Sequence, residues 1–460
     1  MVGALDDLTQ LSRDELIRII REQQRQLERL QSELERLKRR ASAAPFSKGT
    51  RKKKPRRAGR KAGQGHFRHR EAPTTGMPAE ATRVPVSETC CPFCGGPLGE
   101  RDEELVTTTD IPPTPPPEVQ AFLVEVRHCQ QCGKAVRGRH PAVAPNQHGA
   151  TAHRVGEQAK AVAHTLHYGL GVPQRRVPSI LKELRGLEIT QGALNQDAQR
   201  KTAGVVGAAY QQLRAQIRQA PVVHTDDTGW RIGGATAQLM VFTNPQTTVF
   251  QVRPQHRNEE VREVIGNDYP GVLECDRGKS YDAEPLRAVK QQKCWSHLIA
   301  NAHELAQRQQ GRARQFPCQL QRLLQRGLAL TRGRHNLSAS QFHKQATKFQ
   351  RALTHHLRDR LLGNPDNQRL LNGVGTQHDR GNLLRFLDDP RLEPTNNRAE
   401  RALRPAVIRR KVSHCSKTEA GARSFEAFLS VIQTLKQRTP GNLCQALLNL
   451  FTTSGIAPPS

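Results

Sequence analysis

Hydrophobic positions near the amino terminus recur at alternating steps of four and three residues. The repeat follows Ser12-Arg13-Asp14-Glu15, whose Ser-x-x-Glu spacing is that of a capping box at the start of a helix. Its positions are Leu16, Ile20, Gln23, Leu27, Leu30, Leu34, Leu37 and Ala41. This seam predicts a coiled-coil helix over residues 1–42 that joins copies of the chain, with the polar Gln23 setting register or partner number. One amphipathic helix packed on its own domain stays open as the alternative.

Ala and Leu at spacings of three and four residues predict a helical region over residues 150–218. Within it, the segment Ile189-Thr190-Gln191-Gly192-Ala193-Leu194 fits the start of the second helix in a helix-turn-helix, a motif that binds DNA. Ordinary helical packing accounts for the same turn residues. The pattern leaves both interpretations open.

After Pro221 the pattern changes from helical to alternating. It predicts a three-strand meander, a helix and a fourth strand, at Val222–Gly233, Gln238–Thr243, Thr247–Val252, Asn258–Ile265 and Gly271–Asp276. Gln-, Arg- and Leu-rich sequence further on predicts a helical insertion over about residues 310–390. We therefore expect an α/β catalytic core of ribonuclease-H-like type over residues 220–460, interrupted by that insertion.

Acidic residues stand where two of these strands end. In such a core, carboxylates hold two Mg²⁺ ions roughly 3.5–4 Å apart. Asp226 and Asp227 point to opposite faces of their strand, so only one reaches the metals, and the pattern does not say which. Asp276 ends the fourth strand. Glu400, about a turn inside a late helix, offers the third acid, although a salt-bridged surface residue is its default interpretation in isolation.

The charge of the chain points to a polyanionic partner. Lys and Arg total 71 against 42 Asp and Glu, a formal net charge of +29. Eleven Lys or Arg lie in residues 48–70, which carry no acid, so we expect residues 43–82 to be a disordered linker that binds DNA phosphates. The contacts expected there are Lys52, Lys53, Lys54, Arg56, Arg57, Arg60 and Lys61. A plain solvated linker is the alternative.

Two Cys-x-x-Cys pairs predict a small zinc-binding module over residues 83–140. Cys91 and Cys94 form one pair, and Cys129 and Cys132 form the other, each followed by glycine. Four thiolates complete the tetrahedral shell of a structural Zn²⁺. Whether this module contacts DNA stays open.

Four segments together resemble the bacterial DDE transposases of the insertion sequence 66 (TnpC-type) family. They are His224-Thr225-Asp226-Asp227-Thr228, Leu273-Glu274-Cys275-Asp276, Lys293-Cys294-Trp295-Ser296-His297 and Asn396-Asn397-Arg398-Ala399-Glu400-Arg401-Ala402-Leu403-Arg404-Pro405. The likeness extends to the amino-terminal heptad, the basic glycine-rich Gly59 to His66, the two cysteine pairs and the tail from Gly421 to Leu448.

The resemblance implies Asp226, Asp276 and Glu400 as the catalytic triad that holds Mg²⁺, or Mn²⁺ in its place. The family usually has Glu where this chain has Asp227, which we take to support the site or the structure, and the reverse assignment of the two aspartates is the main alternative. Cys294 and His297 form a Cys-x-x-His pair, either a packed cysteine with a histidine at the edge of the active site or a second zinc site. Arg401 and Arg404, beside Glu400, are expected to contact DNA.

The function that the sequence predicts is DNA transposition, in which element ends are cut and the freed 3′-hydroxyls are joined to target DNA. A catalytically silent, zinc-containing DNA-binding relative and a ribonuclease-H-like nuclease that only hydrolyses are the alternatives. Double-stranded DNA, further copies of the chain and accessory transposition proteins are the expected partners. No apolar run is long enough to span a membrane, so we expect a cytoplasmic, nucleoid-associated protein.

Overall fold

The computed structural model describes residues 12–42, 82–111, 115–358, 361–438 and 441–452, which fall into two units, 1–112 and 113–460. In the first unit, α1 (Arg13–Ser42) begins directly after Ser12, as the capping box predicts. Three apolar heptad positions whose side chains the structure describes are exposed, with Ile20 at 54%, Leu27 at 57% and Leu30 at 64%. The predicted helix is therefore present, whereas the coiled coil between copies of the chain stays a prediction.

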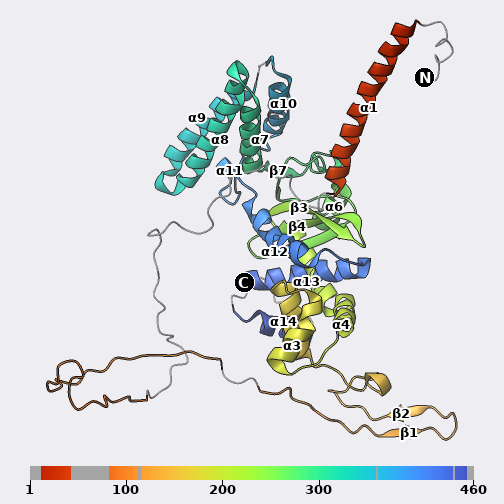
Figure 1. The fold of residues 1–460 in the computed structure, drawn as a ribbon, viewed down its shortest axis with the longest axis vertical. Helices are drawn as coiled ribbons and strands as arrows, with labels where there is room; N and C mark the ends of the chain where they lie inside the picture. The colour runs from red at the N-terminus through yellow and green to blue at the C-terminus, as the bar shows by residue number, and fades with distance from the viewer. Residues whose placement is uncertain (1–11, 43–81, 112–114, 359–360, 439–440, 453–460) are drawn as a thin grey trace. The chain divides into compact units, whose positions relative to one another are not determined.

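The centre of the second unit is a five-stranded mixed sheet (Figure 1). Its strands are β3 (Val222–Ile232), β4 (Ala235–Thr243), β5 (Thr248–Arg253), β6 (Val272–Cys275) and β7 (Lys290–Lys293), in the order β5-β4-β3-β6-β7. The meander pairs are antiparallel, whereas β6 runs parallel to both β3 and β7. Helix α6 (Asn258–Ile265) joins the two halves. The meander, α6 and β6 lie where the alternation of the sequence predicts them.

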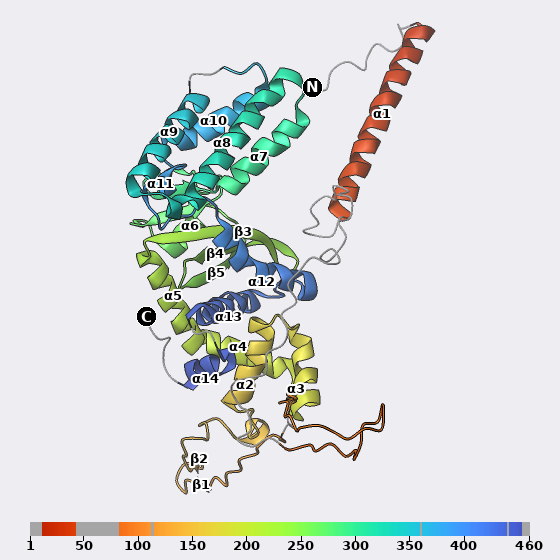
Figure 2. The same ribbon diagram turned by 90° about the vertical axis from the view of Figure 1, so that its left-hand side faces the viewer.

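Helices from both ends of this unit share one core with the sheet. Helix α5 (Val205–Gln219) packs on β5 and on α13 (Glu419–Arg438), and α12 (Asn397–Ser413) crosses β3 and β4, an arrangement visible in Figure 2. Residues of α4 (Gln191–Ala203) and α14 (Leu443–Thr452) join the same apolar cluster. The helical region before the sheet thus shares its apolar core with the sheet.

Helix α13 also closes the outer edge of the sheet. The backbone N–H groups of Thr248, Phe250 and Val252 point away from β4 and donate to side chains of α13 at 3.0, 2.8 and 2.7 Å. The acceptors are Thr434, Ser430 and Glu426. Alternate strand residues thereby match successive helical turns, because two residues of a strand and one turn of a helix have similar lengths. The edge is covered rather than open to another strand.

The region between residues 157 and 203 is helical, as predicted. Helices α2 (Glu157–His164), α3 (Val177–Arg185) and α4 surround a small second core. Thr190 caps α4 by accepting a hydrogen bond from the Ala193 amide at 3.1 Å, and Gly186 ends α3 in the left-handed conformation. The turn is compatible with a helix-turn-helix and with simple packing alike.

The helical insertion forms its own apolar cluster, built from α7 (Trp295–Arg308), α8 (Gln315–Arg332), α9 (Ala339–Leu357), α10 (Pro365–Asp379) and α11 (Arg385–Asp388). It begins earlier than residue 310, because α7 packs along α8. At their crossing, Gly327 leaves room for Trp295: a Cβ atom there would lie 2.5 Å from the indole.

Candidate active site

The strand register brings two of the predicted acids side by side. In the parallel pair β3–β6, His224 lies opposite Glu274, so continuing the register by two residues places Asp226 beside Asp276. Asp227 takes the other face, as strand parity requires, and its Oδ1 lies 3.0 Å from Nδ1 of His256. The two adjacent aspartates therefore have different surroundings, and only Asp226 faces the second acid.

The Asp226 carboxylate is in a strongly desolvated position. Burial is the main cause, and with the neighbouring Asp227 and Asp276 charges it raises the pKa of Asp226 to about 7, against a hydrogen bond from the Asp227 amide. Asp276 is held by the Gly278 amide, which donates to its Oδ1 at 2.8 Å. This pair of carboxylates is an unfavourable arrangement that a bound cation would relieve.

The loop before α12 is tied to both catalytic strands. The side-chain amide of Asn396 donates to the carbonyl oxygen of Thr225 at 2.7 Å, one residue before Asp226. The backbone amide of Glu393 donates to Oε1 of Glu274 at 2.7 Å. Asn396 is the residue before α12, but its side chain reaches the strand instead of capping the helix. The loop thus fixes where α12 starts, and with it Glu400.

Glu400 lies in the first turn of α12, exposed, and close to the pair that follows β7. Ligand atoms of Glu400, Cys294 and His297 all lie within 4.8 Å of one another, the one such group of three among the described residues. The neighbouring Cys294 side chain is the largest cause that raises the pKa of His297 to about 9, and the charges of Asp276 and Asp226 act in the same direction, against burial. His297 therefore lies between the third acid and the aspartate pair.

A family model for the IS66 family of transposases matches residues 153–424, more than half of the chain. The chain belongs to this family. The match spans the sheet, the insertion and α12, and so includes every residue of the candidate site. The search of curated proteins returned no match. In the described part of the transposase no helix is long and apolar enough to cross a membrane.

Each predicted zinc knuckle is a tight turn in the structure. The amides of Cys91 and Gly95 bond the carbonyls of Gly96 and Cys91 at 2.9 and 2.8 Å, and the second knuckle repeats the pattern from Cys129. Backbone amides within each turn lower the pKa of Cys91 and of Cys129. The second knuckle is the tip of a hairpin formed by β1 (Val126–His128) and β2 (Ala135–Arg137).

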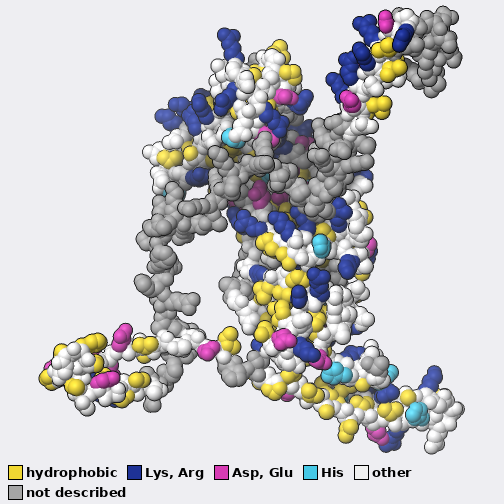
Figure 3. All heavy atoms as spheres, viewed as in Figure 1, with side chains coloured by type: hydrophobic (Ala, Val, Ile, Leu, Met, Phe, Trp, Pro, Cys, Tyr) yellow, Lys and Arg dark blue, Asp and Glu magenta, His cyan; other side chains and the backbone are white. Residues whose placement is uncertain are grey.

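The predicted DNA contacts fall into two groups. Arg401 and Arg404 are exposed on α12. The linker contacts between Lys52 and Lys61 lie outside the described residues. Figure 3 shows a further gathering of Lys and Arg over the helical insertion, where the exposed Lys and Arg residues of α8 and α9 are Arg322, Arg326, Arg332, Lys344, Lys348 and Arg351.

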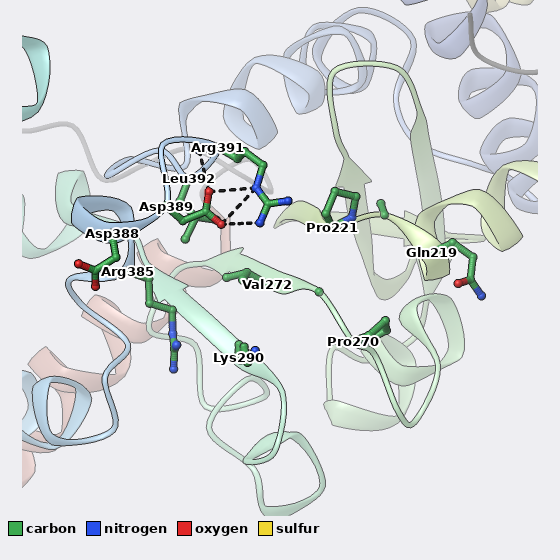
Figure 4. A pocket seen from close by; sticks show the side chains of 12 residues that line it. Gln219, Pro221, Pro270, Val272, Lys290, Arg385, Asp388, Asp389, Arg391 and Leu392 are labelled. Atoms are coloured by element: carbon green, nitrogen blue, oxygen red, sulfur yellow. Dashed lines mark hydrogen bonds and ion pairs between the residues drawn. The ribbon is translucent and has the colours of Figure 1, made fainter. Parts of the chain in front are cut away.

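A pocket of about 440 Å³ lies at the other end of the parallel strands, away from the acids. It is lined by Pro221, Val272 and Lys290, which stand at or before the starts of β3, β6 and β7, and by the loop that carries Arg391 (Figure 4). Arg391 is paired with Asp389 there at 2.7 Å. The pocket shares no residue with the candidate active site.

Several residues of the site were not assigned a role from the sequence. His224 and Glu274 form a buried pair with 3.1 Å between Nδ1 and Oε2, and His256 holds Asp227. Asn396 entered the sequence analysis only as part of a segment that resembles the family, because a sequence does not show which strand a side chain will reach. The sequence carried one indication for His224 and Glu274, which is their position. Each lies two residues before one of the predicted acids and on the same face of its strand as that acid.

Proposed function

We propose that this transposase cuts the ends of its element and joins the freed 3′-hydroxyls to target DNA by two-metal phosphoryl transfer. The observation that carries the proposal is the pairing of Asp226 with Asp276 across the β3–β6 register, with Glu400 on a helix tied to the same strands. The strand order and directions support a ribonuclease-H-like core, in which this is the expected place for the acids.

The residues fit a cation site. Asp226 is a half-buried acid facing a second acid, an arrangement that is costly without positive charge nearby. Asp226, Asp276 and Glu400 would hold two Mg²⁺ ions, or Mn²⁺ in their place, which activate the attacking oxygen and stabilise the leaving one. Asn396 and Glu274 keep the loop before Glu400 against the strands, so they position the third acid. Asp227, held by His256 on the far face, supports the strand.

The decisive experiment uses paired element ends and Asp276→Asn or Glu400→Gln in the full chain. Each variant should lose end cleavage and strand joining by at least about 10³-fold, since each removes charge that acts on the reacting phosphate. End binding in a gel-shift assay should change little. Wild-type protein that forms hydrolysis products without joined strands would make it a nuclease, and retained cleavage in both variants would refute the triad.

The DNA surface that we propose includes Arg401 and Arg404 beside the acid, the basic linker and the insertion's exposed cations. Arginine and lysine neutralise phosphates without reading sequence, so binding through them weakens steeply with salt. Replacing Arg401 and Arg404 by Gln should therefore lower affinity for specific and unrelated duplexes alike, with a shallower salt dependence.

Two further parts of the proposal concern zinc and self-association. The matching backbone turns of the knuckles support a structural Zn²⁺ held by the four cysteines, and metal analysis of Cys91→Ser should show the loss of one equivalent. The outward apolar positions of α1 support a coiled coil between copies of the chain. Removing residues 1–42 should then reduce the sedimentation coefficient and abolish concentration-dependent association.

A further inference from the structure

Cys294, His297 and Glu400 meet where two helices begin. Cys294 is the residue between β7 and α7, His297 is in the first turn of α7, and Glu400 is in the first turn of α12. Cysteine and histidine three residues apart share one face of a helix. Their ligand atoms and a carboxylate oxygen of Glu400 lie within 4.8 Å of one another.

The chemistry of this group differs from that of the three acids. Thiolate and imidazole are ligands that Zn²⁺ prefers, whereas Mg²⁺ prefers oxygen and water. Tetrahedral zinc with these ligands needs its donor atoms roughly 3.3–3.8 Å apart, which small side-chain rotations reach from the observed spacing. Three protein ligands would leave a fourth coordination position open.

The surroundings of this group hold the sulfur in place and add negative charge. The backbone amide of Asn396, the residue before α12, donates to the sulfur of Cys294 at 3.2 Å. Beyond the imidazole lie the carboxylates of Asp226 and Asp276, whose charges act on His297. A divalent ion among these side chains would be surrounded by negative charge.

We propose that Cys294, His297 and Glu400 bind one thiophilic divalent cation, Zn²⁺ in particular, at a site that overlaps the catalytic carboxylates through Glu400. The site is distinct from the cysteine knuckles. Its consequence for activity rests on the proposed function: a Zn²⁺ ion here occupies Glu400, so Zn²⁺ inhibits cleavage and excess Mg²⁺ restores it.

Cobalt binding tests the site without any DNA reaction. The full-length chain is titrated with Co²⁺, and thiolate-to-cobalt absorption and the number of bound ions are compared for wild type, Cys294→Ser and His297→Ala. Cys318→Ser, a half-buried cysteine on α8, is the matched control. We expect wild type and Cys318→Ser to bind one more equivalent than the other two variants, with extra sulfur absorption in the wild-type minus Cys294→Ser difference spectrum.

Equal stoichiometry and spectra for wild type, Cys294→Ser and His297→Ala would overturn the proposal. If Cys294→Ser fails to fold, as a circular dichroism spectrum would show, His297→Ala decides, because His297 is only half-buried. Cleavage at fixed Mg²⁺ with increasing Zn²⁺, normalised to each protein's zinc-free rate, is the second arm. A chain that binds the extra cobalt but never cuts DNA would refute the proposed function and leave the cation site standing.

Discussion

Replacing Asp226 by Asn should make the metal-free protein more stable at alkaline pH. The carboxylate binds its proton more tightly in the folded state, with a pKa of about 7, than in the unfolded chain, where the ordinary value of 3.8 applies. Stability is therefore lost as the pH rises from about 4 to 7, and the cost is complete above pH 7. Asparagine resembles the protonated acid and still accepts the bond from the Asp227 amide.

The magnitude follows from the size of the pKa shift. The pKa rises by about three, and each pKa unit corresponds to roughly 1.4 kcal/mol, so the gain in the free energy of unfolding on substitution has an upper limit of about 4 kcal/mol. Because Asp226 is partly exposed, we expect a gain of about 2–4 kcal/mol. For domains of a few hundred residues this corresponds to an increase of several degrees in the unfolding temperature. At pH 4 the two proteins should differ little.

Thermal unfolding of wild type and Asp226→Asn at pH 4 and pH 8, without added divalent cations, measures the effect. Asp227→Asn is the matched control, because it loses the pair with His256 and removes only one of the charges that act on Asp226, whose burial remains, so it should stabilise the protein less than Asp226→Asn does. Added Mg²⁺ should raise the unfolding temperature of wild type more than that of Asp226→Asn. The reasoning fails if Asp226→Asn gains nothing at pH 8, or gains as much at pH 4.

Three substitutions test the packing around the site by denaturant unfolding. Ser430→Ala leaves the buried Phe250 amide without an acceptor and should cost about 1–3 kcal/mol; no change would mean that water replaces the hydroxyl. Gly327→Ala forces a methyl group against Trp295 and should lower the free energy of unfolding by about 1–3 kcal/mol. An unchanged free energy of unfolding would show that α7 and α8 can move apart at little cost. Glu274→Ala leaves a buried histidine unpaired and frees the loop before Glu400, so stability should fall by about 3–5 kcal/mol together with cleavage. Full cleavage activity would argue against a positioning role.

Strands and helices with a periodic apolar pattern were predictable from the sequence. Strand β7 was not, because Lys290-Gln291-Gln292-Lys293 reads as a polar segment. Two of its buried side chains interact with groups outside the strand: Lys293, fully buried, lies 3.1 Å from an oxygen of Asp282, and the Gln292 side-chain amide donates to the Leu383 carbonyl. Such pairings depend on tertiary contacts, which no local pattern carries.

The choice between Asp226 and Asp227 likewise depends on tertiary contacts that the local sequence pattern does not contain. Strand parity predicted that they face opposite ways, and this is what the structure shows, but parity alone could not assign the faces. The assignment to Asp226 came from the family resemblance. The β3–β6 register, which pairs His224 with Glu274, supplies the physical reason, because it places Asp226 and not Asp227 next to Asp276.

The third acid is held differently from the other two, and this bears on how the site is completed. Asp226 and Asp276 belong to or directly follow strands whose spacing the sheet fixes. Glu400 is exposed on a helix, and only the loop before that helix is anchored to the strands, through Asn396 and Glu274. Its carboxylate lies with Cys294 and His297, and the three acids do not form such a close group among the described residues. If Mg²⁺ is held by all three acids, as we propose, we therefore expect its binding to move the exposed Glu400 side chain more than the strands that carry the aspartates.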